Sequence, residues 1–289
     1  MRIDVEGVSE LRFDTGLPVR AASAVAPFGD GWLIVQDDAT HAAWQRPGGV
    51  AAVRVVPAVD GHELFSSAAG TKHLKPDFEA AFPAGDGALL LGSGSTPARM
   101  RASLVTRSGF AVHDLTPVYA AAAAALDVPL GGLNLEGACR LGDRVRWFQR
   151  GNSAAGMPSA SVDVAASALT GGPVVVGDVR RYDLGSVGGV ALAVTDAVAL
   201  PDGRVLVSAA AEDTPNAVDD GPVVGAALAL LDGDQVTDVA PLPESGSGAY
   251  KVEGLAVRDV TGDGVRLLAV VDADDPDAAS VRLDLTLRW

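Results

Sequence analysis

Residues 136–152 read EGACRLGDRVRWFQRGN, an acidic residue followed by a short apolar run, a Gly-Asp turn and a second apolar run. This arrangement is typical of a β-hairpin, because Gly and Asp readily supply the positive φ angles of tight turns. The same pattern recurs at residues 23–38, 79–95, 196–210 and 253–274. Its leading residues are 56, 57, 60 and 57 positions apart, so five repeats account for nearly the whole chain.

Each repeat contains further β-patterned runs after its hairpin, such as GVAAVRVVPA (49–58) and SASVDVAAS (159–167). About four strands per repeat is the content of a propeller blade. The sequence therefore predicts an all-β fold, a single five-bladed β-propeller domain over residues 1–289. The alternative of six blades would need about 48 residues each and one blade without the pattern.

The two ends of the chain indicate how the ring closes. The chain finishes on a strand-like SVRLDLTLRW (280–289) and opens with a segment containing ELRFD (10–14), which has no hairpin of its own. We expect the N-terminal strand to pair beside the C-terminal one and complete the last blade, which covers its edge. Six consecutive alanines predict a short helix over residues 117–128, inserted in a blade connection.

Composition excludes several classes of function. The net charge of −15 argues against nucleic acid and anionic membranes as partners, and no Lys/Arg cluster offsets it. No run of about 18 apolar residues occurs, and the N-terminal residues lack a signal-peptide pattern, which predicts a soluble, cytoplasmic protein. The single cysteine, Cys139, lies in an apolar strand pattern and is expected to be a buried side chain.

The first strand of each blade lines the channel of a propeller, so the five leading residues should meet at one channel mouth. These are Ser23, Glu79, Glu136, Asp196 and Glu253. The ends of the second strands should meet at the same face, namely Asp37, Asp38, Ser93, Ser95, Arg150, Asn152, Asp272 and Asp274. Four of the leading residues are carboxylates, and two carboxylates about 6 Å apart repel by roughly 3 kcal/mol at an effective dielectric near 20.

Such a ring requires protons, paired Lys and Arg side chains, or a divalent cation. Carboxylate oxygens suit Ca²⁺ or Mg²⁺, which makes Glu79, Glu136, Asp196 and Glu253 the candidate ligands. Two other interpretations stay open. The polar residues could hydrogen-bond neighbouring backbone around a water-filled channel, or they could form a metal-free catalytic or binding site.

Basic and polar residues near the same face could hold a small phosphorylated or carboxylated molecule. The candidates are His73, Lys75, Arg99, Arg150, Asn152 and Lys251. Surface salt bridges are the alternative explanation for each of the charged ones.

Several motifs together resemble those of an uncharacterised family of bacterial β-propellers that is similar to the esterase-like domain associated with phytases. They are KPDFEA (75–80), LGSGS (91–95) with a following Arg, LNLEGA (133–138) with FQRGN (148–152), and KVEGLA (251–256). The resemblance implies a propeller and no established reaction.

A second resemblance is to the senescence-marker and gluconolactonase propellers. EGACRLGDRVRWF looks like their opening strand, with Ala138 at the expected proline, and TDAVALPDGRVLVS looks like their metal-binding strand. This resemblance implies that Glu136 and Asp196 bind a catalytic divalent ion, that Asp196 can also move a proton, and that Asn152 is a candidate third ligand.

These observations lead to one main functional hypothesis and one alternative. The main hypothesis is a divalent-metal-dependent hydrolase of a small ester, lactone or phosphoester, with Asp196, Glu136 and Arg150 as catalytic residues. The alternative is a non-enzymatic propeller that binds a ligand or protein on the same face, with any ion structural. The sequence makes no prediction of oligomeric state.

Overall fold

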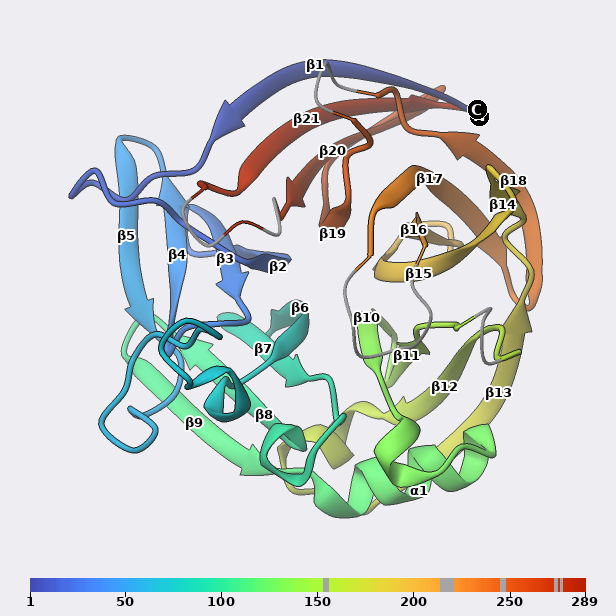
Figure 1. The fold of residues 1–289 in the computed structure, drawn as a ribbon. Coiled ribbons are helices and arrows are strands. Elements are labelled where there is room, and N and C mark those ends of the chain that lie inside the picture. The colour runs from blue at the N-terminus through green and yellow to red at the C-terminus, as the bar shows by residue number, and fades with distance from the viewer. Residues whose placement is uncertain (153–155, 214–220, 245–247, 273–274, 276–277) are drawn as a thin grey trace.

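Five β-sheets form a closed ring around a central axis in the computed structural model, seen along that axis in Figure 1. The structure describes residues 1–152, 156–213, 221–244, 248–272, 275 and 278–289. The innermost strands of neighbouring sheets contact one another in cyclic order. This arrangement is a five-bladed β-propeller, as the repeat predicts.

Blades one and two each contain four antiparallel strands. Blade one comprises β2 (Ala22–Phe28), β3 (Gly31–Gln36), β4 (His41–Arg46) and β5 (Gly49–Arg54). Blade two comprises β6 (Phe78–Ala84), β7 (Gly87–Gly92), β8 (Arg101–Thr106) and β9 (Gly109–Asp114). In both blades the inner hairpin turns at the predicted Gly-Asp pair.

Blades three and four differ in strand length. Blade three comprises β10 (Leu135–Leu141), β11 (Arg144–Gln149), β12 (Ser159–Ala165) and β13 (Val176–Tyr182). Blade four comprises β14 (Ser186–Val187), β15 (Val190–Ala199), β16 (Val205–Glu212), β17 (Val223–Asp232) and β18 (Gln235–Pro241). The short β14 pairs with the start of β15 and makes this sheet five-stranded.

The fifth blade closes the ring with both ends of the chain. It comprises β19 (Val252–Thr261), β20 (Gly264–Val271) and β21 (Val281–Arg288), with β1 (Arg2–Glu10) as its outermost strand. Arg2 pairs with Arg288, which confirms the predicted closure. The closing strand ends at Glu10, however, and most of the ELRFD segment lies beyond it, where Arg12 pairs with Pro18 in a separate turn.

The core lies between the blades. All residues of β7 and β16 are buried, because the middle strands of a blade are covered on both faces by neighbouring blades. The outermost strands are largely exposed, as in β9 and β1. This burial accounts for the apolar runs that follow each hairpin turn.

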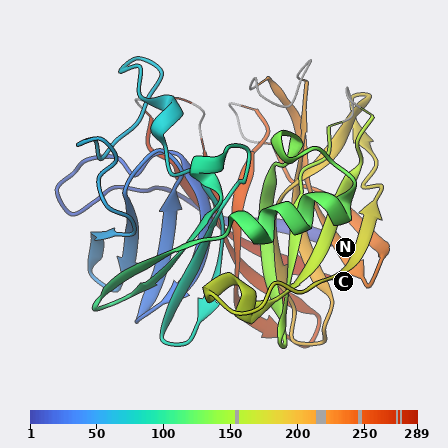
Figure 2. The same ribbon diagram turned by 90° about the horizontal axis from the view of Figure 1, so that it is seen from below.

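One helix, α1 (Thr116–Leu126), connects β9 to β10 and confirms the predicted insertion. The described residues also include short 3-10 helices: η3 (Leu130–Gly132) follows α1 in the same connection, and η1 (Lys72–Leu74), η2 (Pro97–Arg99) and η5 (Ala166–Thr170) lie in other connections. Helix α1 packs on the outer side of the ring against β12 and β13 (Figure 2). Its Tyr119 is fully buried, stacks edge-on against Trp147 and donates a hydrogen bond to the carbonyl of Gly92.

Candidate functional site: the channel mouth

A β-bulge at the same position in each innermost strand turns one side chain out of the regular ladder. The bulged residues are Ser23, Glu79, Glu136, Thr195 and Glu253. In blade four the equivalent residue is therefore Thr195, one position before the predicted Asp196. Asp196 belongs to the next position, where it pairs with Ser208 in the ladder.

The two hydroxyl residues among the five link neighbouring blades. Ser23 donates a 2.6 Å hydrogen bond to the carbonyl of Phe78, and Thr195 donates a 2.5 Å bond to the carbonyl of Val252. Each acceptor lies directly before the glutamate of the next bulged strand, Glu79 or Glu253. In these two blades the bulge position therefore stabilises the ring.

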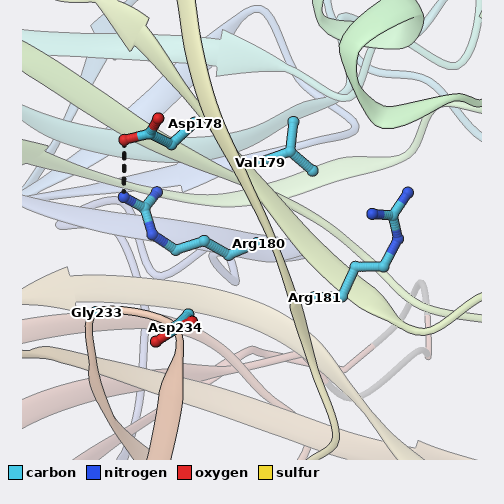
Figure 3. A pocket seen from close by; sticks show the side chains of 6 residues that line it. All are labelled: Asp178, Val179, Arg180, Arg181, Gly233 and Asp234. Carbon is cyan, nitrogen blue, oxygen red and sulfur yellow. Dashed lines mark hydrogen bonds and ion pairs between the residues drawn. The ribbon is translucent and has the colours of Figure 1, made fainter.

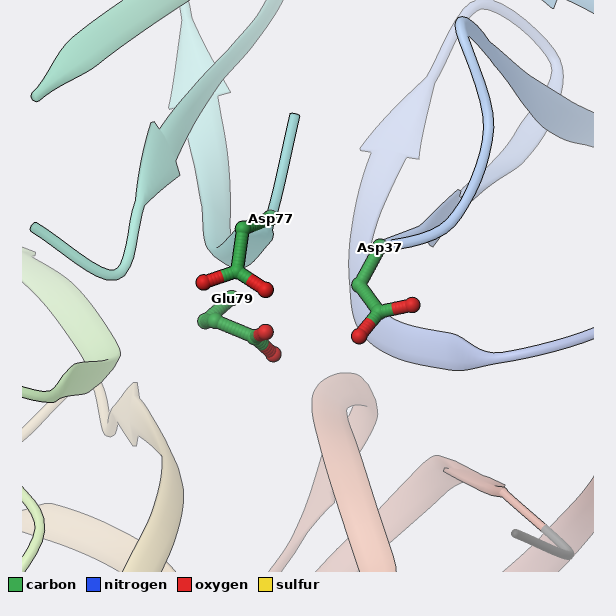
Figure 4. A group of neighbouring side chains, drawn as sticks. All are labelled: Asp37, Asp77 and Glu79. Atoms are coloured by element: carbon green, nitrogen blue, oxygen red, sulfur yellow. The ribbon is translucent and has the colours of Figure 1, made fainter. Parts of the chain in front are cut away.

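Charged side chains from blades one and two form what we call the aspartate cluster. Its members are Arg20, Asp37, Asp38, Lys75, Asp77, Glu79 and Arg99. Oxygens of Asp37, Asp77 and Glu79 all lie within 4.8 Å of one another, and the three carboxylates face a common space (Figure 4). These three carboxylates form a compact group that could hold a cation. Only Glu79 of the three belongs to the predicted ligand set.

Asp77 is the ionised centre of the aspartate cluster. Lys75 Nζ lies 2.6 Å from its Oδ1 and also contacts Asp37, while Arg99 Nη1 lies 2.9 Å from its Oδ2. Ser93 donates a further hydrogen bond to Asp77. Burial opposes ionisation of Asp77, but Lys75 and Arg99 outweigh burial and hold the pKa of this carboxyl below its ordinary value.

The neighbouring acids of the same cluster are shifted in the opposite direction. Burial and the nearby charges of Asp77 and Asp37 raise the pKa of Glu79 well above its ordinary value. Burial and Asp37 also raise the pKa of Asp38 to about 6, although Arg20 pairs with it at 2.9 Å. Within the described residues Glu79 makes no hydrogen bond or ion pair, so its carboxylate is available to a ligand.

Blades three to five supply a second group, which we call the glutamate cluster. Its members are Glu136, Arg150, Asp196, Glu212, Lys251 and Glu253. Acids and bases alternate in it. Arg150 lies 3.0 Å from Glu136 and also contacts Glu212, and Lys251 lies 3.5 Å from Glu212 and 3.1 Å from Glu253.

Two buried carboxylate oxygens of the glutamate cluster have no hydrogen-bond partner among the described residues, Glu136 Oε2 and Asp196 Oδ1. The other oxygen of each carboxylate accepts a hydrogen bond: Glu136 Oε1 accepts one from Asn134 at 2.8 Å, and Asp196 Oδ2 accepts one from the Leu255 amide at 2.6 Å. Burial raises the pKa of Glu136 to about 7, with Arg150 opposing the shift and Glu253 adding to it. Burial likewise raises the pKa of Asp196 well above its ordinary value. Because an unpaired buried oxygen is costly, these two atoms mark places for a proton, water or cation.

The structure separates the predicted anion-binding residues into two groups. Lys75, Arg99, Arg150 and Lys251 all belong to the two clusters, where carboxylates already contact them. His73 lies exposed on η1, and Asn152 follows β11, where its backbone pairs with Met157. Asp274, expected at the same face, lies outside the described residues.

Sequence reasoning missed Asp77 and Glu212 as site residues. Asp77 precedes the leading Glu79 by two positions and adopts a φ of +57°, a left-handed conformation that bends the chain into the strand. Its signal was the run Lys75-Pro-Asp-Phe-Glu79, in which three charges alternate with apolar residues. Glu212 is the last residue of β16, which has eight residues where the equivalent strands β3, β7 and β11 have six, and the hairpin pattern alone does not show this extension.

A depression in the outer surface is lined by residues that belong to neither cluster. It is lined by Asp178, Val179, Arg180, Arg181, Gly233 and Asp234, from β13 and the turn between β17 and β18 (Figure 3). Arg180 is paired with Asp178 at 3.3 Å and with Asp163 at 3.0 Å. The positive charge of Arg180 is thus already neutralised within the protein.

The fold and the channel mouth define a five-bladed propeller with a strongly charged channel entrance. Residues 71–276 match DUF6910, a family of unknown function, and the chain belongs to this family. A search of the curated proteins finds no match. No helix in the described part of the chain is long and apolar enough to cross a membrane.

Similar solved structures have low sequence identity to the chain. A glycosyl hydrolase from Bacteroides ovatus is 10% identical over 93% of this chain and 84% of that chain, with a TM-score of 0.41. Apo AztD from Citrobacter koseri is 10% identical over 91% and 74%, with a TM-score of 0.31. A second AztD structure from the same organism is 11% identical over 93% and 74%, with a TM-score of 0.33. These similarities are too low to transfer a function.

Proposed function

We propose that this protein binds a divalent cation, Ca²⁺ or Mg²⁺, at the channel mouth and uses it to hydrolyse a small ester, lactone or phosphoester. One observation carries the proposal: the two clusters together hold eight acidic against five basic side chains, an excess of three acidic groups. Closely spaced buried carboxylates are stable only with protons or an added cation.

The donor atoms fit a hard cation. Asp37, Asp77 and Glu79 offer carboxylate oxygens at compatible spacing, and the Lys75 ammonium already stands in for a cation against two of them. These three residues would hold the ion. The other predicted ligands, Glu136, Asp196 and Glu253, belong to the glutamate cluster, where the uncommitted oxygens of Glu136 and Asp196 would be the places for a further proton or cation.

A bound divalent ion would supply a polarised substrate oxygen and a water of lowered pKa. Glu136 lies in the range where a carboxyl can give or take a proton near neutrality, because burial raises its pKa to about 7. Asp196, whose pKa is also raised by burial, is the second candidate proton carrier. Arg150 would orient an anionic group of the substrate next to Glu136, which it already contacts.

The resemblance of KPDFEA, LNLEGA and KVEGLA is to an uncharacterised propeller family similar to the esterase-like domain associated with phytases, and it supports the propeller fold without implying an established reaction. The resemblance of the opening strand at Glu136 to the gluconolactonase propellers supports a metal-dependent reaction. The anionic group of the substrate would also meet Lys75, Arg99 and Lys251 at the channel mouth. His73 and Asn152, which lie outside the two clusters, would contact only a larger ligand.

A second candidate function is favoured by the pairing of the basic residues. Arg20, Lys75, Arg99, Arg150 and Lys251 all contact carboxylates, so much of the charge is arranged to stabilise the ring. A non-enzymatic propeller that binds a ligand or protein at this face, with a structural ion, would show the same network.

Metal analysis of the purified protein and thermal melting in EDTA, Ca²⁺ and Mg²⁺ test the cation. At a hundredfold excess over its Kd a bound ion should stabilise the fold by about 2.7 kcal/mol. Glu79→Gln should abolish this shift yet leave stability in EDTA nearly unchanged, since Glu79 has no hydrogen bond among the described residues. The exposed Glu10→Gln is the matched control.

Hydrolysis of p-nitrophenyl acetate, a γ-lactone and p-nitrophenyl phosphate then separates the two functions. Cation-dependent turnover of one substrate that is lost in Glu79→Gln supports the enzyme. A bound ion without turnover of any of the three supports the binding propeller, and the absence of both ion and melting shift contradicts the cation site.

A further inference from the structure

Lysine is rare in this chain and concentrated at the channel mouth. Lys72, Lys75 and Lys251 are its only lysines among 22 Lys and Arg residues, and two of the three belong to the clusters. Arginine supplies nearly all the other positive charge. Lysine differs from arginine in carrying a compact point charge on a flexible stem, which fits a role that requires movement.

The Lys75 ammonium lies among the carboxylates that would bind the divalent ion. It contacts Asp37 and lies 2.6 Å from Asp77, and its charge also acts on Glu79. An ion coordinated by all three carboxylates would need the space in front of the same oxygens (Figure 4). Lys75 and a divalent ion therefore compete for one position.

We propose that Lys75 is a tethered cation that closes the divalent site, and that binding of the ion expels its ammonium toward the channel, where it becomes available to an anionic ligand. This inference rests on the proposed cation site. The exchange adds a regulatory step to that site, because the ion and the Lys75 ammonium cannot occupy it together. Binding of the ion would then favour binding of an anion to the released ammonium.

The charge balance of the three carboxylates favours replacement of the Lys75 ammonium by the ion over binding of the ion beside it. With Arg99 retained on Asp77, a divalent ion in place of Lys75 neutralises the three ionised carboxylates completely. If Lys75 stayed, the same group would carry an extra positive charge, with an ammonium and a divalent ion only a few ångströms apart. Without the ion, the ammonium of Lys75 and the guanidinium of Arg99 supply two positive charges against these three carboxylates.

The local structure allows Lys75 to leave and holds Arg99 in place. Lys75 follows the short helix η1, and both of its ion pairs are to members of the aspartate cluster. Arg99 ends η2 and is fixed by Ser95 at 2.8 Å as well as by Asp77. A rotation of the Lys75 side chain thus opens the site without breaking other described contacts.

Calorimetric titration of the full chain with Mg²⁺ and Ca²⁺ tests the exchange, comparing wild type with Lys75→Met and Lys75→Gln. Removing the tethered charge should tighten cation binding at least tenfold. Lys72→Met, which removes an exposed lysine from helix η1 directly before Lys75, should leave the affinity unchanged. Two different replacements keep the test usable if one variant folds poorly.

NMR of isotope-labelled lysine side chains gives a second readout on the wild type, since only three signals are possible. The Lys75 ammonium signal should move on addition of Mg²⁺, while that of Lys72 stays. Unchanged or weaker binding in both Lys75 variants, with binding intact in the wild type, overturns the exchange and leaves the cation site standing. No binding in any of the proteins overturns both.

Discussion

The aspartate and glutamate clusters contain four acidic residues each, yet they handle the same repulsion in different ways. In the aspartate cluster two bases converge on Asp77, which is held ionised while Glu79 is left without a base of its own. In the glutamate cluster Arg150 and Lys251 each contact two acids. One buried oxygen of Glu136 and one of Asp196 are left without a hydrogen-bond partner among the described residues. The placement of the bases, more than the number of acids, therefore decides where a cation or a proton is held.

The largest effect is expected from Asp77→Asn, which removes the shared partner of Lys75 and Arg99 while keeping a residue that tolerates the left-handed backbone. Removing one side of a buried ion pair leaves uncompensated charge, so the free energy of unfolding in EDTA should fall by roughly 3 kcal/mol. Urea denaturation measures it, with the exposed Asp202→Asn as control. A loss no larger than that of the control would show that the aspartate cluster has no ionised centre.

Asp196→Asn should raise the free energy of unfolding instead of lowering it. Because burial raises the folded-state pKa of Asp196 above its ordinary value of 3.8, the folded protein binds this proton more tightly than the unfolded chain does. Its contribution to stability is therefore complete below pH 3.8 and is lost as pH rises through the folded-state pKa.

In EDTA at pH 8 the Asp196→Asn variant should be more stable than the wild type by on the order of 1 kcal/mol, because no buried carboxylate has to be ionised. The difference should shrink toward pH 4. Denaturation curves across this pH range measure it, and a variant that is less stable at pH 8 would show that the Asp196 anion is stabilised in the fold.

A smaller loss is expected from Thr195→Val, which keeps the shape of the side chain and removes its bond to the Val252 carbonyl. A buried acceptor left without its donor should cost about 1 kcal/mol. Ser23→Ala removes the equivalent bond to Phe78 and should behave alike. Thermal melting compares both with the exposed Thr15→Val. Equal stability of all three would show that the hydroxyls do not link the blades.

The fold follows from the sequence because it depends on local signals repeated five times. The Gly-Asp turns, with Pro-Asp-Gly in the fourth repeat, set the hairpins, and their spacing of about 57 residues sets the number of blades. The predicted closing strand is present, but it spans Arg2–Glu10 and so precedes most of the ELRFD segment, because the pairing of Arg2 with Arg288 joins the two ends of the sequence and no local pattern marks its register.

The site is less predictable because it depends on single-residue register. Glu79, Glu136 and Glu253 occupy the bulge position of their blades, but in blade four the acidic Asp196 lies one residue beyond the bulged Thr195. The offset is visible only when the residues are counted back from the turn: Thr195 precedes Asp202 by 7 positions, as Glu136 precedes Asp143. The grouping of Asp37 with Asp77 and Glu79 joins two blades across a long connection, and it depends on the unusual backbone of Asp77.

The pairing of β1 with β21 also determines how the protein can unfold. In a linear array of repeats a terminal unit can be lost while its neighbours persist. Here each blade has a neighbour on both sides, and the last blade contains both ends of the chain. Detaching β1 exposes the edge of β21 and removes the strand pairing that closes the ring of blades. The five blades are thus expected to unfold as one cooperative unit, and the charges at the channel mouth, contributed by all five, keep their arrangement only while the circle is intact.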